Sequence, residues 1–246
     1  MAFNGGGVSD SPVRWCGTEG GNPVRQGGAV WSTTACPDTW CGPGSGTGSP
    51  PNTTGAIWYP SGVDVTLQTG DRWFFMPGQA LHPLSDLVAF YHNSIGMNGH
   101  LEIDFAISRT GEVDPLHAAA YAGFGAWIRS CYGAPVASAA LPAGATSFVL
   151  SLGSAAVTVD RVRMKEDQSA GQLIYSYTVE AQVAGAWQPF SSGVSIGASR
   201  IDLASAVAAT ALRFSVTAGW GTPTGLDFAA FAPEPCALAA FEYATQ

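Results

Sequence analysis

The sequence predicts an α/β layer, in the form of a partial (β/α) TIM-like barrel, followed by an antiparallel β-sandwich. Three observations favour this fold class. A helix–strand–helix pattern runs from residue 84 to 133, Gly, Ala and Pro dominate residues 133 to 146, and only short alternating runs follow. We therefore place the C-terminal part of a barrel domain at residues 1–134 and the β-sandwich domain at 135–246.

Residues 1 to 56 are rich in Gly, Pro, Ser and Thr, with turn signals every few positions. This composition predicts a long loop around one short strand. Loops of this length inside a compact domain tend to be functional, so we interpret this segment as a lid or a pocket wall. The alternative is a loop that only connects neighbouring elements.

The first predicted helix starts near residue 84 and shows apolar residues at helical spacing on one face, namely Leu84, Leu87, Val88, Tyr91 and Ile95. Pro83 suits a helix start, and Gly96 and Gly99 suit the region after its end. Alternation from Leu101 to Ile107 then predicts a strand.

The second predicted helix begins after Asp114-Pro115, an N-cap residue followed by proline at the first helical position. Gly133 ends it. Its predicted buried stripe is Leu116, Ala119, Ala120, Phe124, Trp127 and Ile128.

Beyond a predicted linker at 133 to 146, six short alternating runs are separated by turn residues such as Ala184-Gly185 and Ser192-Gly193. The runs are 147 to 152, 157 to 165, 173 to 183, 186 to 190, 211 to 217 and 226 to 231. Spacing of this kind is typical of an antiparallel β-sandwich.

Composition excludes several classes of function. The 246 residues carry a net charge of −8, which argues against binding a nucleic-acid backbone electrostatically. No apolar run approaches the roughly 20 residues of a membrane span, and the first residues show no signal-peptide pattern. Asn52-Thr53-Thr54 is a glycosylation sequon in a Gly/Pro/Ser-rich loop, as in exported proteins.

Five cysteines leave at least one unpaired within the chain. Cys36 and Cys41 flank four residues, so a local disulfide in an oxidising compartment or inert thiols are both open. A zinc site lacks a Cys-x-x-Cys pair, and His82, His92, His100 and His117 show no metal-ligand spacing. We expect no metal and no organic cofactor.

Several sequence blocks together resemble one family, the α-L-fucosidases of glycoside hydrolase family 29. The blocks are 58–65 (WYPSGVDV), 72–75 (RWFF), 91–99 (YHNSIGMNG), 10–19 (DSPVRWCGTE), and 159–167 (VDRVRMKED) with Gly171-Gln172. The resemblance extends more weakly over nearly the whole chain. It implies release of terminal L-fucose from glycans with retention, and an extracellular or lysosomal/secretory location. The partner it implies is a fucosylated glycan or glycoconjugate.

The resemblance implies that Glu19 is the general acid/base. A carboxyl on a glycine-flanked loop beside Trp15 can be desolvated, stay protonated and donate to a leaving oxygen. The structural alternative is a surface glutamate beside a turn.

Trp15, Trp58, Asp64 and Trp73 are the substrate-binding candidates. The resemblance implies Asp64 through the block 58–65, and indole faces suit the methyl group and C–H face of a deoxyhexose. Buried core is the alternative for each aromatic residue. Two positions depart from the family pattern: Gly62 stands where a glutamate is frequent, and Met76 where a histidine is usual.

The family's nucleophile is an aspartate several tens of residues before that glutamate, and only 18 residues precede Glu19. We therefore expect a fragment, or a chain completed by another polypeptide that carries the missing N-terminal barrel half. Glu102 and Asp104 share a strand face and are interpreted as solvated or hydrogen-bonded carboxylates. The alternative functions are a non-catalytic carbohydrate-binding or scaffold protein and a structural β-protein.

Overall fold

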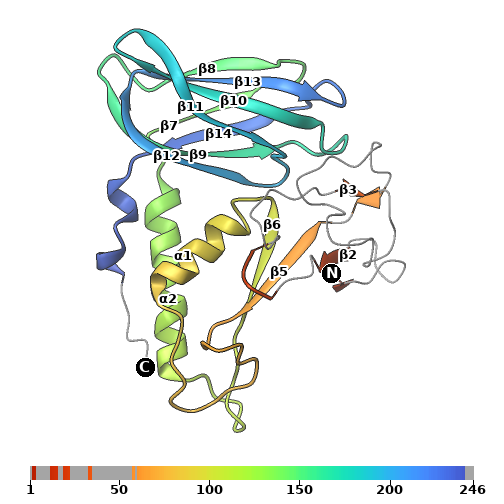
Figure 1. Ribbon diagram of the computed structural model, residues 1–246, viewed down its shortest axis with the longest axis vertical. Helices are drawn as coiled ribbons and strands as arrows, with labels where there is room; N and C mark the ends of the chain where they lie inside the picture. The colour runs from red at the N-terminus through yellow and green to blue at the C-terminus, as the bar shows by residue number, and fades with distance from the viewer. Residues whose placement is uncertain are drawn as a thin grey trace.

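The computed structural model describes residues 2–3, 12–15, 19–22, 33–34, 57–58 and 60–241. In this part of the chain, an α/β layer lies against one sheet of a β-sandwich (Figure 1). Most strands are antiparallel and helices are few. Neither of the two α-helices among these residues combines the length and hydrophobicity that a bilayer-spanning segment requires.

The α/β layer contains a four-stranded sheet in the order β1-β2-β5-β6, with every neighbouring pair parallel. Its strands are β1 (Ala2–Phe3), β2 (Pro12–Trp15), β5 (Ser61–Thr66) and β6 (Gly99–Asp104). A separate antiparallel pair joins β3 (Thr33–Thr34) to β4 (Ile57–Trp58). The prediction of one short strand before residue 57 was wrong, because strands of two to four residues are too short to show periodicity.

Helix α1 (Leu84–Asn93) connects the parallel strands β5 and β6, and its predicted start is confirmed. Strand β6 begins at Gly99 and ends at Asp104, earlier than the predicted end at Ile107. Its pairing with β5 stops at Thr66↔Asp104, and the alternating residues beyond that point pair with no strand in the described part of the chain.

Helix α2 (Pro115–Gly133) has the predicted bounds, and the Asp114 carboxylate accepts a hydrogen bond from the Leu116 N–H at 2.8 Å. Ala120, Phe124 and Trp127 are buried as predicted, whereas Ala119 is exposed. The start of α2 therefore depends on neighbouring residues only, which is why the sequence predicts it correctly.

The sandwich consists of two four-stranded antiparallel sheets, in the orders β11-β10-β13-β8 and β12-β9-β14-β7. The strands are β7 (Ala137–Leu141), β8 (Ser147–Ser151), β9 (Val157–Glu166), β10 (Ile174–Val183), β11 (Ala186–Val194), β12 (Arg200–Ala209), β13 (Ala211–Gly219) and β14 (Leu226–Phe231). Two corrections follow. The predicted linker contains β7, whose Ala-Ser-Ala-Ala sequence has little contrast in hydrophobicity, and β12 was missed because a register shift between Leu203 and Val207 interrupts its alternation.

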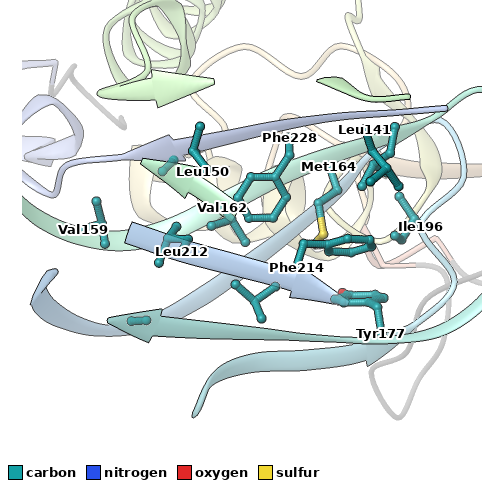
Figure 2. Packing of buried hydrophobic residues seen from close by; sticks show 14 of the residues in the cluster. Leu141, Leu150, Val159, Val162, Met164, Tyr177, Ile196, Leu212, Phe214 and Phe228 are labelled. Carbon is teal, nitrogen blue, oxygen red and sulfur yellow. The ribbon is translucent and has the colours of Figure 1, made fainter. Parts of the chain in front are cut away.

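The core of the sandwich lies between the two sheets, where inward-facing residues of both interdigitate (Figure 2). Phe214 packs against Tyr177 from the neighbouring strand and against Phe228 from the facing sheet. All three are at most 1% exposed. This alternation of buried and outward residues is what the short runs of the sequence encode.

A second apolar cluster joins the sandwich to the helices. Trp127 of α2 contacts Tyr91 of α1, and Tyr132 contacts Phe231 at the end of β14. The chain then returns along α2 through the 3₁₀ turns η1 (Glu234–Cys236) and η2 (Leu238–Ala240). No local pattern in the sequence predicts this returning segment.

A disulfide between Cys131 and Cys236 fixes the returning segment to α2 across 105 residues of sequence. The Trp127 indole N–H also donates to the Cys236 carbonyl at 3.2 Å. The suggested Cys36–Cys41 bridge lies outside the described residues.

Asn98 connects the two layers, although the sequence predicted only a helix stop for Asn98-Gly99. Its amide oxygen accepts from the Ala198 N–H at 2.7 Å, and its backbone N–H donates to the Ser199 carbonyl at 2.8 Å. A Cβ atom at Gly197 would lie 2.2 Å from the Asn98 amide, so only glycine allows this close approach.

Candidate active site

The carboxyl ends of the parallel strands β2, β5 and β6 meet at one edge of the α/β layer. Three segments follow at that edge: 19–22 after β2, 67–83 after β5 and 105–113 after β6. In parallel α/β architectures this edge is where ligand-binding loops gather. It carries Trp15, Glu19, Asp64 and Trp73, four of the five predicted site residues.

Trp15 and Asp64 are brought together by the pairing of β2 with β5, in which Trp15 lies opposite Gly62. The Trp15 indole N–H donates to Asp64 Oδ1 at 2.9 Å. Both side chains are partly buried. One carboxylate oxygen of Asp64 is therefore engaged by protein, and the bond fixes the orientation of the indole.

The backbone of the Glu19 segment is tied to the same strand. The Gly21 N–H donates to the Asp64 carbonyl at 3.1 Å. Gly21 has φ +68°, and a Cβ atom there would lie 2.4 Å from the Phe90 ring, so the turn requires glycine. This anchors the bend directly after Glu19 against β5 and α1.

The Glu19 side chain itself is exposed in the described structure. The desolvated environment expected from the sequence is not seen among the described residues. To act as a proton donor, the Glu19 carboxyl would have to be shielded from water by a further surface, such as a bound sugar or another part of the protein.

Trp73 lies in the segment after β5, which is organised by Gln68. The buried Gln68 amide donates to the Arg72 and Phe74 carbonyls at 3.2 and 3.1 Å and accepts from the Met76 N–H at 3.0 Å. These bonds hold the turn that presents Trp73, which is partly buried, and Phe74, which is 88% exposed.

Replacing Gln68 by Met should keep the side-chain volume and remove all three hydrogen bonds. We expect a loss of about 1–3 kcal/mol in the free energy of unfolding, since each such bond contributes roughly 1 kcal/mol. Trp73 should also become more accessible to acrylamide in fluorescence quenching. Gln188→Met, at an exposed position of β11, is the matched control; equal effects of the two substitutions would show that Gln68 does not organise the turn.

The fifth predicted residue, Trp58, is in β4 opposite Thr33. Its side chain lies outside the described part of the structure.

A histidine not selected from the sequence lies at the same edge. His117, in the first turn of α2, is 3% exposed and contacts the rings of Phe75 and Phe105 at centroid distances of 5.7 and 6.4 Å. Its Nδ1 has no hydrogen-bond partner among the described residues. The aromatic contacts link the segments after β5 and β6. The sequence could have indicated His117 only through its position one turn after the N-cap residue Asp114.

Glu102 and Asp104 of β6 differ in environment. Glu102 is exposed, with His100 at 3.7 Å, as the solvated interpretation predicted. Asp104 is partly buried, and burial raises the pKa of its carboxyl while nearby His117 lowers it. Its Oδ2 atom lacks a hydrogen-bond partner in the described part of the chain. No group of three or more His, Cys, Asp or Glu residues suited to a metal ion occurs there either.

These features define a class of protein: a parallel α/β layer with candidate ligand-binding loops, braced by a C-terminal β-sandwich. The fold is similar to that of the glycoside hydrolase family 29 α-L-fucosidases. No protein-family model matches the chain, and no curated protein matches it in sequence.

Three solved structures illustrate the similarity. A Bacteroides thetaiotaomicron protein assigned as an α-L-fucosidase is 28% identical, with a TM-score of 0.82 over 91% of this chain and 52% of its own. A glycoside hydrolase 29 family member from an unknown rumen bacterium is 25% identical, with a TM-score of 0.77 over 91% of this chain and 42% of its own. The Ruminococcus gnavus GH29 fucosidase in complex with fucose is 20% identical, with a TM-score of 0.78 over 96% and 53%, which shows the shared fold. The chain thus spans about half the length of these proteins or less.

Proposed function

We propose that this chain forms the acid/base side of a retaining α-L-fucosidase that releases terminal L-fucose from glycans. The observation that carries the proposal is the gathering of Trp15, Asp64, Trp73 and the Glu19 segment at one edge of a parallel sheet. The similarity to fucosidase-type structures, one of them solved with fucose, supports the choice of sugar.

Each residue has a distinct role in the proposed reaction. Glu19 protonates the glycosidic oxygen as the bond to C1 breaks, and its carboxylate then takes a proton from the attacking water. Trp73, with Trp58, offers an apolar face to the methyl group of fucose. Asp64 accepts a hydrogen bond from a sugar hydroxyl through Oδ2, while Trp15 holds Oδ1.

A retaining glycosidase needs a second carboxylate about 5–5.5 Å from the first. We propose that the parallel sheet is part of a (β/α) barrel and that the nucleophilic aspartate comes from a barrel half outside the described sheet. Two facts support this. The outer edge of β6 has no strand partner among the described residues, and the chain corresponds to about half of the similar proteins. An open parallel edge of this kind readily pairs with another strand.

The test is a comparison of two fucosides with different leaving groups. With the second barrel half supplied, Glu19→Gln should reduce kcat/KM for a methyl fucoside at least a hundredfold, because its alkoxide must be protonated as it leaves. The kcat/KM for 2,4-dinitrophenyl fucoside should fall much less, since this leaving group needs no proton and kcat/KM reports only the bond-breaking step. Glu112→Gln, at an exposed loop position, is the matched control.

Three outcomes are informative. Equal losses of kcat/KM on both substrates would contradict the acid/base role. Glu19-dependent turnover by this chain alone would support the enzyme and overturn the requirement for a second barrel half. Saturable fucose binding without turnover, even after a barrel half is supplied, would favour the non-catalytic carbohydrate-binding alternative.

We also propose an extracellular or secretory location. The Cys131–Cys236 disulfide supports it, since such bonds persist mainly in oxidising compartments.

A further inference from the structure

A second surface with the properties of a ligand site lies on the sandwich, where β11 is interrupted by a β-bulge. Val179 pairs with Ser191 and Glu180 with Pro189, so Phe190 is the extra residue. Bulges of this kind re-aim side chains and open the strand surface. Because β11 is an edge strand, no strand pairs with its outer side among the described residues.

Two hollows adjoin the bulge. One of about 340 Å³ lies between the end of α1 and β12, and the other, of about 510 Å³, lies along β10. Both are lined by Phe190, Ser191 and Ser192, so they form one surface around this segment. We call it the bulge groove. Volumes in this range are typical of small-ligand sites.

Polar side chains without a hydrogen-bond partner among the described residues line both halves of the bulge groove. Asn93 lies in the smaller hollow, Thr178 in the larger, and Ser192 in both. The side chains of these three residues make no hydrogen bond within the described part of the chain. They are therefore available to hydroxyl groups of a ligand, beside the apolar surfaces of the partly buried Phe190 and of Leu203, which is 57% exposed.

The charges in the bulge groove are neutralised by the protein. Asp202 is paired with Arg200 at 2.7 Å and also accepts from Tyr177 and Ser191. Glu180 is paired with Arg213 at 2.6 Å. Burial, aided by Arg161, lowers the pKa of His92 to about 4, so its ring is neutral at physiological pH. Paired charges favour an uncharged ligand over phosphate or an anionic polymer.

We propose that the bulge groove binds a neutral oligosaccharide, with a sugar ring against Phe190 and sugar hydroxyls on Asn93, Thr178 and Ser192. Apolar surface beside unpaired hydroxyl and amide groups matches the two kinds of surface of a sugar ring. The shared segment between two hollows suits a chain of more than one sugar. This site is separate from the proposed fucose site and does not depend on its activity.

Isothermal titration calorimetry with 2′-fucosyllactose, cellotetraose and xylotetraose tests the proposal. At least one should bind saturably, Ser192→Trp should weaken its binding at least tenfold by filling the groove, and Thr178→Val should weaken it about threefold. Ser151→Trp is the matched control, since Ser151 is an exposed serine on β8 of the same sheet and outside both hollows. Trp73→Ala should leave this binding unchanged, which distinguishes it from the fucose site.

Failure of all three sugars to bind would overturn the proposal, as would unchanged binding in Ser192→Trp. Competition by inorganic phosphate at millimolar concentration would contradict the neutral character of the groove. Loss of binding in Trp73→Ala alone would assign the sugar to the carboxyl edge of the parallel sheet instead.

Discussion

Replacing Cys131 and Cys236 together by alanine should lower the free energy of unfolding by about 2–5 kcal/mol. The disulfide closes 105 residues of sequence, and long closed loops restrict the unfolded chain most. The loss should be largest where Phe231, Leu238 and Phe241 pack toward the helices. Urea-induced unfolding, followed by circular dichroism, measures it.

Reductant provides the control for this substitution. In dithiothreitol the wild-type protein and the double alanine variant should unfold at the same midpoint, whereas without reductant the wild-type midpoint should be the higher one. A wild-type midpoint that is the same with and without dithiothreitol would contradict a structural role for this bond.

Substituting Glu166 by Gln should change how stability depends on pH. The carboxylate is 6% exposed and accepts backbone N–H groups of Ile174 and Gly197 at 2.8 and 3.3 Å, besides that of Leu173. Burial raises the pKa of Glu166 from 4.5 to about 7, against the lowering effect of these hydrogen bonds. The folded state therefore binds the proton more tightly than the unfolded state.

The sign follows from proton linkage. The contribution of Glu166 is fully present below pH 4.5, the unfolded value, and is lost as pH rises through about 7. A pKa raised from 4.5 to about 7 corresponds to about 3 kcal/mol. The stability of wild type relative to Glu166→Gln should fall by that order between pH 4.5 and 8, measured by urea unfolding. Glu102→Gln controls for the change in net charge, and a difference independent of pH would contradict the prediction.

Local signals in the sequence were sufficient for some elements. Asp114-Pro115 specifies the start of α2 because N-cap geometry involves only neighbouring residues. The alternating runs identified six of the eight sandwich strands, because alternation of buried and exposed residues is also a local property of the sequence. β7 and β12 were missed, since small residues in one and a register shift in the other remove the alternation.

Long-range pairings could not be predicted from local patterns. Trp15 and Asp64 were both selected, but their hydrogen bond spans 49 residues and depends on the parallel register of β2 and β5. The disulfide between Cys131 and Cys236 joins residues 105 positions apart, which no local pattern connects. The link from Asn98 to the sandwich likewise depends on how the two layers pack.

The exposure of Glu19 shows where the site depends on more than this sheet. Its backbone is anchored through Gly21, while its side chain has no cover in the described structure. This is what we expect of a carboxylate at one side of a cleft whose other side is supplied separately.

The most direct test of the fucose site is a titration of this chain with L-fucose, followed by the indole N–H signals of Trp15 and Trp73 in ¹⁵N-labelled protein. Single Trp→Phe variants assign the two signals. We predict saturable shifts of both, while the Trp187 signal, from strand β11 of the sandwich, stays constant. Unchanged Trp15 and Trp73 signals up to high millimolar L-fucose would contradict a sugar site at the carboxyl edge of the parallel sheet.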